Sequence, residues 1–224
     1  MFHRVIFMSS AFISSIMLIS GCSTHNVNKS QSQINADFLK KHNKAIKTKN
    51  KKTDNIDNAC LILKQNPDWH RALYRTQLVY RISIPVQLAF VRHESSFNHK
   101  ARPVNNKKKW FIFNSYKSTA YGFAQVLNGT WDEFQTTFKN KKLKRTNFGH
   151  SVEFIGWYNR KHINSGLDGN NISHLYLAYH EGLGGYKKKT YINKPCLVDY
   201  SNSVQKTSIK YSNQISSCNI KVKK

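Results

Sequence analysis

Apolar residues recur at three- and four-residue spacing along most of the 224-residue chain, and no residue-by-residue alternation is long enough to build a β-sheet. A proline or a small polar residue stands near the start of each apolar stripe, as is typical of the first turn of a helix. The helix starts predicted on this basis are Asn66-Pro67-Asp68, Ser83-Ile84-Pro85, Thr130 with Glu133 three residues later, Ser151 and Ser173. Glycines from Gly182 onward are expected to end the last helix. The fold is therefore predicted to be predominantly α.

One globular domain is expected between residues 59 and 220, followed by a short basic tail at 221–224. Hydrophobic residues form 39% of the chain and aromatic residues 12%, which is enough for a core at this length. The apolar stripes that would build the core include Trp69, Leu73, Thr76, Tyr80, Val86, Ala89, Phe90, Val152, Ile155 and Tyr158.

Residues 1–21 have the pattern of a secretory signal, because Arg4 is followed by an apolar run and then by small residues. This segment is too short and too rich in serine to favour a membrane span. It ends in Leu18-Ile19-Ser20-Gly21-Cys22, which resembles a bacterial lipobox, where Cys22 is lipidated and becomes the mature N-terminus. An ordinary cleaved signal with a chance cysteine is the alternative. Ser23 after the cysteine resembles the pattern sorted to the outer membrane, so we expect an outer-membrane lipoprotein that faces the periplasm.

Residues 22–58 are polar and rich in lysine, and Phe38 is the one aromatic residue among them. We predict a lipidated N-terminus followed by a flexible basic tether, because such a segment can bury little apolar surface. The whole chain has 36 Lys and Arg against 11 Asp and Glu, a formal charge of +25. A basic arm for nucleic acid is the alternative for this segment, but it fits poorly with export, so no nucleic-acid partner is expected.

Three cysteines remain for an oxidising compartment: Cys60, Cys196 and Cys218. Cys60 lies at the start of the predicted domain and Cys218 near its end, so a disulfide between these two is the first choice. Cys196 would then be free, although the sequence leaves the other two pairings open. The ten histidines show no recognisable ligand spacing, so no metal and no cofactor are expected.

The chain has four glutamates: Glu94, Glu133, Glu153 and Glu181. Glu133 is expected to complete the helix cap that begins at Thr130. Glu153 would lie in the first turn of a helix, where a solvated surface acid suits the helix dipole. Glu94 ends an apolar helix at the edge of the core, where partial burial raises the pKa of a carboxyl toward that of a general acid. The alternative for Glu94 is a paired or exposed surface residue.

Three short motifs follow one another in a fixed order, with Tyr186 after the last. They are Glu94-Ser95-Ser96-Phe97, Ala120-Tyr121-Gly122-Phe123-Ala124-Gln125 and Ala178-Tyr179-His180-Glu181-Gly182. Together they resemble the E-S-x-F, G-L-M-Q and A-Y-N-x-G motifs of the lytic transglycosylase SLT family, over about residues 80–190. With Phe154-Ile155-Gly156-Trp157-Tyr158, the chain is similar to a subgroup of SLT-domain lipoproteins. This resemblance implies a lysozyme-like fold, α with minimal β, that cleaves the glycan strands of peptidoglycan.

The resemblance makes Glu94 the single catalytic acid/base. It would protonate the glycosidic oxygen between N-acetylmuramic acid and N-acetylglucosamine, and then take a proton from the muramoyl C6 hydroxyl as that oxygen attacks C1. The product is a 1,6-anhydro sugar, and the substrate's acetamido group would stabilise the oxocarbenium-like state in place of a second carboxylate. The positions expected to bind substrate are Gln125 in the cleft, Tyr179 near the acid, Gly122 at a close backbone approach, Tyr121 and Tyr186. Core aromatic residues are the alternative for the last two.

Two departures from the family pattern affect these expectations. The family often has a serine nine to eleven residues after the acid, where this chain has Pro103, Val104 and Asn105. Residues 104–117 look like an insertion, so Ser115 or Ser118 would supply that hydroxyl. His180 and Glu181 replace the common Asn-x of the third motif, and Glu181 as a second acid would allow hydrolysis by water.

A lysozyme-type hydrolase and a non-catalytic peptidoglycan-binding lipoprotein are therefore the alternative functions. The expected partners are peptidoglycan glycan strands and a membrane reached through the lipid on Cys22, and no particular protein partner is indicated. The basic charge favours both encounters, because membrane lipids and the peptide stems of peptidoglycan carry negative charge.

Overall fold

The computed structural model describes residues 30–50, 53–103 and 118–218. Within these ranges the chain is built from α-helices, one 3₁₀ turn and a single isolated β-bridge between Tyr121 and Val126. The elements are α1 Gln31–Lys41, α2 Ala59–Gln65, α3 Pro67–Tyr80, α4 Ile84–Ser95, α5 Asn128–Thr137, α6 Phe148–Asn164, α7 Ile172–Lys187, η1 Thr190–Asn193 and α8 Pro195–Ser216. The prediction of a predominantly α fold is confirmed.

Several predictions fall outside the described residues. They are the signal peptide, the lipidation site Cys22, the 104–117 insertion with Ser115, and the 221–224 tail. None of the described helices is both long enough and apolar enough to cross a membrane.

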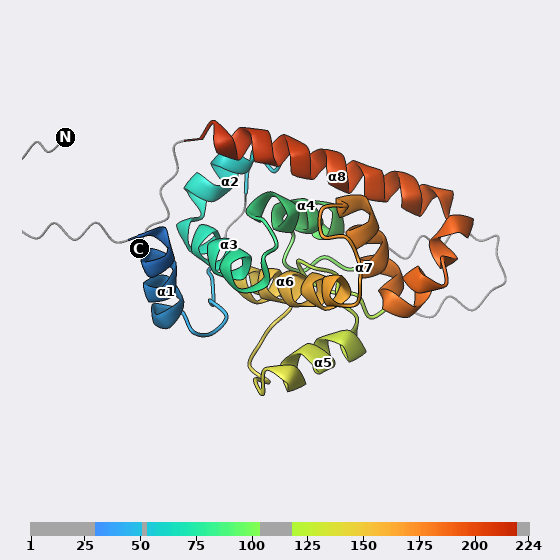
Figure 1. Ribbon diagram of the computed structural model, residues 1–224, viewed down its shortest axis with the longest axis horizontal. Coiled ribbons are helices and arrows are strands. Elements are labelled where there is room, and N and C mark those ends of the chain that lie inside the picture. Colours follow the sequence, from blue (N-terminus) through green and yellow to red (C-terminus); the bar gives the residue numbers. More distant parts are fainter. Residues whose placement is uncertain (1–29, 51–52, 104–117, 219–224) are drawn as a thin grey trace, which may run out of the picture.

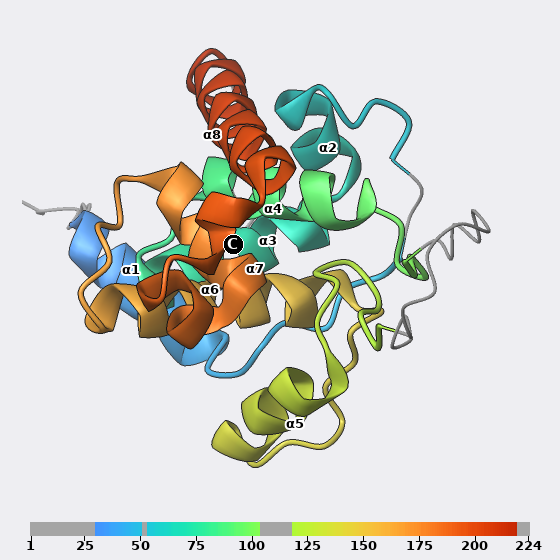
Figure 2. The same cartoon turned by 90° about the vertical axis from the view of Figure 1, so that its right-hand side faces the viewer.

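Helix α4 runs through the middle of the molecule, with the longest helix, α8, packed across it and across α7 (Figure 1). On the other side α3 packs against α6. Figure 2 shows α8 and α5 on opposite sides of this arrangement. Because α4 is buried along nearly its whole length, the C-terminal end of this helix is a rigid place from which to present a side chain.

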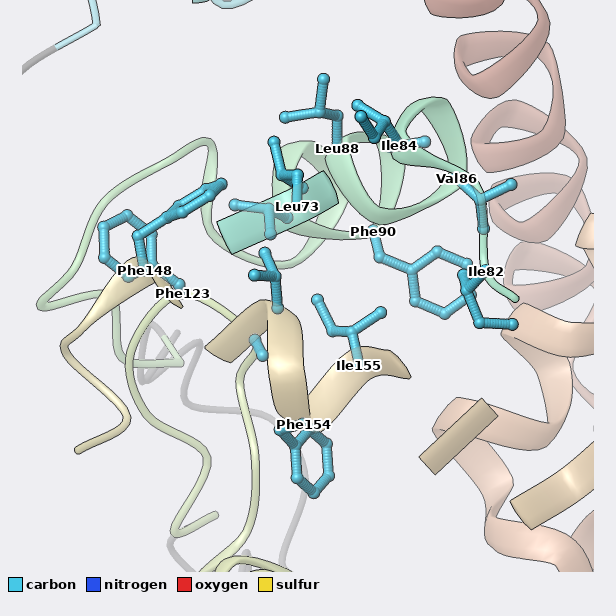
Figure 3. Packing of buried hydrophobic residues seen from close by; sticks show 14 of the residues in the cluster. Leu73, Ile82, Ile84, Val86, Leu88, Phe90, Phe123, Phe148, Phe154 and Ile155 are labelled. Carbon is cyan, nitrogen blue, oxygen red and sulfur yellow. The ribbon is translucent and has the colours of Figure 1, made fainter. Parts of the chain in front are cut away.

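The core lies largely between α4 and α6. Figure 3 shows Phe90 of α4 above Ile155 and Phe154 of α6, all of them at most 1% exposed. A second group of aromatic rings surrounds Trp69, which stacks on Phe148 with ring centroids 3.9 Å apart. Each such side chain contributes roughly 1.5–3 kcal/mol through burial, so these contacts hold the helices in register.

The helices predicted from Pro67, Ser83-Ile84-Pro85, Ser151 and Ser173 are all present, but the starts predicted at Ser151 and Ser173 are too late in the chain. Helix α3 begins at Pro67 and α4 begins just after Ser83. Helices α6 and α7 begin instead after Asn147 and Asn171, whose side-chain oxygens accept hydrogen bonds from backbone N–H groups of the first turn. Asparagine caps a helix at least as well as serine, and in both cases an asparagine came earlier in the chain.

The predicted capping box at Thr130 and Glu133 is wrong. Helix α5 begins at Asn128 after Leu127, so Thr130 already lies inside the helix. Glu133 instead forms an exposed ion pair with Lys161 of α6.

The prediction of a flexible tether is wrong for the described part of residues 22–58. Ser30 caps α1, and Phe38 on this helix is 8% exposed and packs edge-on against Tyr74 with centroids 5.1 Å apart. Further along, the Thr48 backbone N–H donates to Asn147 Oδ1 (3.2 Å) and the Asn147 amide donates back to the Thr48 carbonyl (2.7 Å). One buried ring and these backbone hydrogen bonds are enough to dock this segment on the domain.

Helix α8 was not anticipated, although it is the longest helix of the described chain. Its buried face consists of Ser201, Val204, Ser208 and Tyr211. The spacing is helical, but two of the four residues are serines, so the stripe is not visible as a hydrophobic pattern. Just beyond its end, Cys218 is joined to Cys60 by a disulfide with Cα atoms 5.9 Å apart, and Cys196 is a free, exposed thiol.

Candidate active site

A cleft of about 420 Å³ opens beside the C-terminal end of α4. Segments from α4, α6, α7 and residues 118–130 contribute to it. The residues that line it are Glu94, Ser118, Ala120, Gln125, Val126, Leu127, Thr130, Phe154, Tyr158, Tyr179, His180, Glu181 and Gly182. The fold thus brings together five predicted site residues that are up to 87 positions apart in the chain, namely Glu94, Ser118, Gln125, Tyr179 and Glu181.

Glu94 lies in the last turn of α4 and is partly buried. Ser96, just beyond the helix, adopts a left-handed conformation (φ 48°), and the buried ring of Phe97 then holds the chain against the core. Burial raises the pKa of Glu94 from 4.5 to about 7, and a hydrogen bond with Tyr176 offsets part of this rise. A carboxyl with this pKa carries a proton in about half of the molecules at neutral pH.

Tyr176 hydrogen-bonds to Glu94 but was not predicted as a site residue, and neither were several residues that line the cleft, among them Phe154, Tyr158 and His180. The Tyr176 side chain is 2% exposed in α7, and its ring packs edge-on against Phe90 with centroids 5.3 Å apart. Burial, together with the charge of Glu94, raises the pKa of Tyr176 far above 10, so its hydroxyl stays protonated and donates to the carboxyl. Tyr176 lies three positions before Tyr179, on the same face of α7. This spacing could have indicated that Tyr176 lies near the same site.

Tyr179 lies beside Glu94, but its hydroxyl is engaged elsewhere. It donates to the carbonyl oxygen of Ala124 at 2.7 Å. Burial and the nearby charge of Glu94 raise the pKa of Tyr179 well above 10. Tyr179 therefore ties α7 to the segment that carries Gln125, which keeps the two sides of the cleft together.

Gln125 faces the cleft from a strained backbone position, with φ at 45°. Its side-chain amide donates to the carbonyl oxygens of Ala101 (2.9 Å) and Gly122 (2.8 Å). Both N–H groups are thereby used, and the amide oxygen remains as an acceptor. Gly122 has φ 80°, and a Cβ there would collide with the backbone of Arg145. The close approach expected at Gly122 is therefore to the protein's own chain.

Two predicted substrate-binding aromatic residues do not line the cleft. Tyr121 packs its ring under the guanidinium of Arg102, 4.2 Å from the ring centroid. The hydroxyl oxygen of Tyr186 lies 2.5 Å from Nδ1 of His174. The ring of Tyr186 stacks on Tyr191 with centroids 5.4 Å apart. Ser118 does line the cleft, and its hydroxyl accepts a hydrogen bond from the Ala120 backbone N–H at 3.3 Å.

Glu181 lines the cleft as an ionised group whose oxygens are already occupied. Lys194 Nζ lies 2.8 and 2.9 Å from its two oxygens, and Thr190 and His180 also hydrogen-bond to it. Burial alone would raise its pKa, but the hydrogen bonds of Lys194, Thr190 and His180 lower the pKa to about 2. A carboxylate with this pKa has no proton to donate near neutral pH and is a weak base.

Just after Glu181 the chain kinks rather than ending the helix. Gly182 has φ 69° and ψ 161°, and α7 then continues to Lys187. The predicted stop at Gly182 is therefore an interruption. Thr190 of η1 and Lys194, the residue after η1, both hydrogen-bond to Glu181. Glu181 therefore holds the η1 segment against the kink in α7.

Glu153 is not the solvated surface acid that was predicted. It is 2% exposed on α6, where it forms an ion pair with Arg75 and accepts a hydrogen bond from the Tyr80 hydroxyl at 2.8 Å. Both partners belong to α3, which packs on this face of α6. The prediction for Glu153 considered only the dipole of α6, because the sequence does not show that α3 places Arg75 next to it.

Among the described residues, no three His, Cys, Asp or Glu side chains gather closely enough to hold a metal ion. In the comparisons with known proteins, the family model described as "Transglycosylase SLT domain" matches residues 10–218. No curated protein matches the chain.

Proposed function

Because the chain belongs to the transglycosylase SLT domain family of the lysozyme-like superfamily, we propose that it is a peptidoglycan lytic transglycosylase with Glu94 as its acid/base. The observation that supports this most directly is the environment of the two glutamates that line the cleft. Glu94 has a pKa of about 7, whereas Glu181 has a pKa of about 2 and is held by a lysine. Of the two, Glu94 alone is suited to give and take a proton near neutral pH.

In the proposed reaction, protonated Glu94 donates its proton to the glycosidic oxygen between N-acetylmuramic acid and N-acetylglucosamine, and the C1–O bond breaks. The Glu94 carboxylate then accepts the proton of the muramoyl C6 hydroxyl while that oxygen bonds to C1. The product ends in 1,6-anhydro-N-acetylmuramic acid, and Glu94 is protonated again. The substrate's own acetamido group would stabilise the positive charge at C1, as in glycosidases that use substrate assistance.

Tyr176 has a defined part in this scheme as a positioning residue. Its hydroxyl donates to Glu94 and stabilises the carboxylate that forms after the first proton transfer. Because the tyrosine is held among Phe90, Tyr179 and Tyr200, the carboxyl keeps its orientation between the two steps.

A lysozyme-type hydrolase is the alternative, because Glu181 is a second carboxylate on the cleft. An inverting hydrolase needs a carboxylate free to activate water. Both oxygens of Glu181 instead accept hydrogen bonds within the protein. This arrangement favours attack by the substrate's C6 hydroxyl over attack by water.

Digestion of purified sacculi, followed by mass spectrometry of the released muropeptides, tests the proposal. We expect the wild type to release anhydro products, and Glu94→Gln to release none while still binding sacculi. Glu133→Gln, which changes an exposed glutamate that does not line the cleft, is the matched control and should digest normally. Products that contain one more water would identify a hydrolase, and a wild type that binds without releasing anything would identify a binding protein.

We also propose that the mature chain is an outer-membrane lipoprotein anchored through Cys22. The lipobox-like sequence before Cys22 supports this location. Treatment with globomycin, or the substitution Cys22→Ser, should change the mobility of the protein on a gel. Unchanged mobility in both cases would contradict the lipid anchor.

A further inference from the structure

A second cavity, of about 410 Å³, lies at the N-terminal end of α7, before the residues of this helix that line the cleft. It is lined by Asp168, Asn170 and Asn171 before α7, by Ser173 and His174 in the first turn of α7, and by Asn202 and Gln205 of α8. It shares no lining residue with the cleft. Figure 1 shows α7 beside α8, the pair of helices between which this cavity, here called the amide pocket, is formed.

Three amide side chains of the pocket are fixed in orientation because the oxygen of each accepts a hydrogen bond from the first turn of α7. Asn171 Oδ1 accepts from the backbone N–H of His174 (3.1 Å), and Gln205 Oε1 accepts from that of Ser173 (3.2 Å). Asn202 Oδ1 accepts from the hydroxyl of Ser173 (3.0 Å). Within the described part of the chain, no group accepts from the three NH₂ groups, so they are available as donors to a ligand.

The pocket also offers acceptors and an imidazole. Asp168 uses Oδ1 to accept from the Asn170 backbone N–H (2.9 Å) and keeps a second oxygen. His174 pairs Nδ1 with the Tyr186 hydroxyl, which leaves Nε2 for another partner. A ligand that both donates and accepts hydrogen bonds would satisfy these groups together.

The chemistry of the lining excludes two other classes of ligand. None of the residues that line the pocket is Lys or Arg, in a chain that has 36 of them, so the pocket is not built for an anion. None of them has an aliphatic or carbocyclic aromatic side chain either, so it is not built for an apolar ligand. N-acetylglucosamine, one of the two sugars of a peptidoglycan strand, is neutral and offers both donors and acceptors.

We propose that the amide pocket is a non-catalytic binding site for N-acetylated glycan. The inference rests on the proposed function only for the source of that glycan, the strand that the cleft cuts. His174 at the pocket and Glu181 at the cleft are separated by about 10 Å along the α7 axis, at 1.5 Å per residue. The two sites are therefore close enough for one glycan strand to reach both, and in this proposal the pocket holds the polymer while the cleft cuts it.

Nuclear magnetic resonance of the side-chain NH₂ groups tests the binding directly. The full chain carrying Glu94→Gln, which prevents turnover, is titrated with N-acetylglucosamine oligomers and, separately, with inorganic phosphate. We expect the oligomers to shift the NH₂ resonances of Asn202 and Gln205, and phosphate to leave them unchanged. Shifts confined to residues of the cleft, or shifts caused by phosphate alone, would overturn the proposal.

A pair of nearly isosteric substitutions tests the role of the donors. Asn202→Asp with Gln205→Glu keeps the oxygens that bind Ser173 but replaces each outward NH₂ by an oxygen. We expect affinity for sacculi stripped of their peptide stems to fall on the order of tenfold, as two neutral hydrogen bonds would predict. Asn213→Asp, which makes the same change on the exposed side of α8, is the control and should bind normally.

Two further measurements keep the outcomes distinct. The unfolding midpoint of the double variant should match that of the wild type, and cleavage of short soluble glycans should be unchanged, because these reach the cleft alone. Unaltered sacculus binding by the double variant would overturn the proposal. If the wild type cleaves nothing, the proposed function fails, while the NH₂ shifts still decide whether the pocket binds glycan.

Discussion

At the residue scale, burial and one hydrogen bond act on the pKa of Glu94 in opposite directions. Removing the hydroxyl with Tyr176→Phe should therefore raise this pKa above 7. The alkaline limb of the pH–rate profile should move to higher pH, because the general acid keeps its proton longer. We also expect the rate at the optimum to fall by roughly tenfold or more, as is typical for losing a hydrogen bond to a charged group.

The control for Tyr176→Phe is Tyr179→Phe, which removes a hydroxyl of the same helix that donates to Ala124 instead of Glu94. Its alkaline limb should stay where the wild-type limb lies, even if the rate falls. An unchanged pH profile in Tyr176→Phe would show that the tyrosine does not act on the acid.

The same carboxyl links stability to pH. Its pKa is about 7 in the folded protein and ordinarily 4.5, so folding favours the protonated form. Its contribution to stability is present below about pH 4.5 and is lost as the pH rises through 7. Glutamine lacks this dependence, so Glu94→Gln should raise the free energy of unfolding at pH 8 by on the order of 2 kcal/mol, with little change at pH 4.

Urea unfolding at the two pH values measures this effect, with Glu133→Gln as the exposed control. A Glu94→Gln variant no more stable than the wild type at pH 8 would show that Glu94 is not held in a desolvating site.

The position of Glu94 at the end of an apolar helix could be predicted from the sequence, because this position depends on the residue's own helix. The environments of Glu153 and Glu181 could not be predicted. The partners of those carboxylates, Arg75 and Lys194, come from other parts of the chain, so their burial and charge depend on packing. Tyr176 was missed for the same reason, because its hydrogen bond to Glu94 depends on a contact between α7 and α4.

At the scale of elements, the ion pair between Arg75 and Glu153 joins α3 to α6 inside the protein. Glu153→Ala would leave the guanidinium buried without a counter-charge, and the Tyr80 hydroxyl would lose its acceptor. We expect the free energy of unfolding to fall by roughly 3–5 kcal/mol. Glu133→Ala, which breaks the exposed pair with Lys161, should cost less than about 1 kcal/mol.

A double variant keeps this prediction testable if Glu153→Ala does not fold. Arg75→Met with Glu153→Leu removes both charges, so it should recover most of the lost stability. Equal losses in the double and single variants would mean that the uncompensated charge is not the cause.

The start of a helix was predictable where the residue that begins it restricts its own backbone conformation. Pro67 and Pro85 marked α3 and α4 because proline restricts its own φ. Helix α8 escaped because Ser201 and Ser208 occupy half of its buried face, where tight packing against neighbouring helices selects small side chains. Helix α1 was not predicted because its docking depends on a contact between Phe38 and Tyr74, which lie far apart in the chain.

At the scale of the whole molecule, the disulfide between Cys60 and Cys218 spans 158 positions, and it closes nearly the whole described domain into one loop. Loop-closure entropy assigns such a bridge roughly 3–5 kcal/mol of stability. Cys60→Ser with Cys218→Ser should lower the unfolding midpoint accordingly, and a reductant should then have no further effect. Cys196→Ser changes a free thiol and should leave the midpoint unchanged.

If the chain is the lipoprotein proposed above, docking of α1 also sets how far from the membrane it can work. A free tether over residues 22–58 would let the domain move widely, but the described chain is already held against the domain from Ser30 onward. With a lipid on Cys22 as proposed, seven residues, or eight Cα–Cα steps, separate the anchor from Ser30. Fully extended, they span at most about 28 Å. Cleavage would then be confined to the layer of peptidoglycan nearest the membrane, and lengthening this segment with a flexible insert should extend cutting to more distant strands.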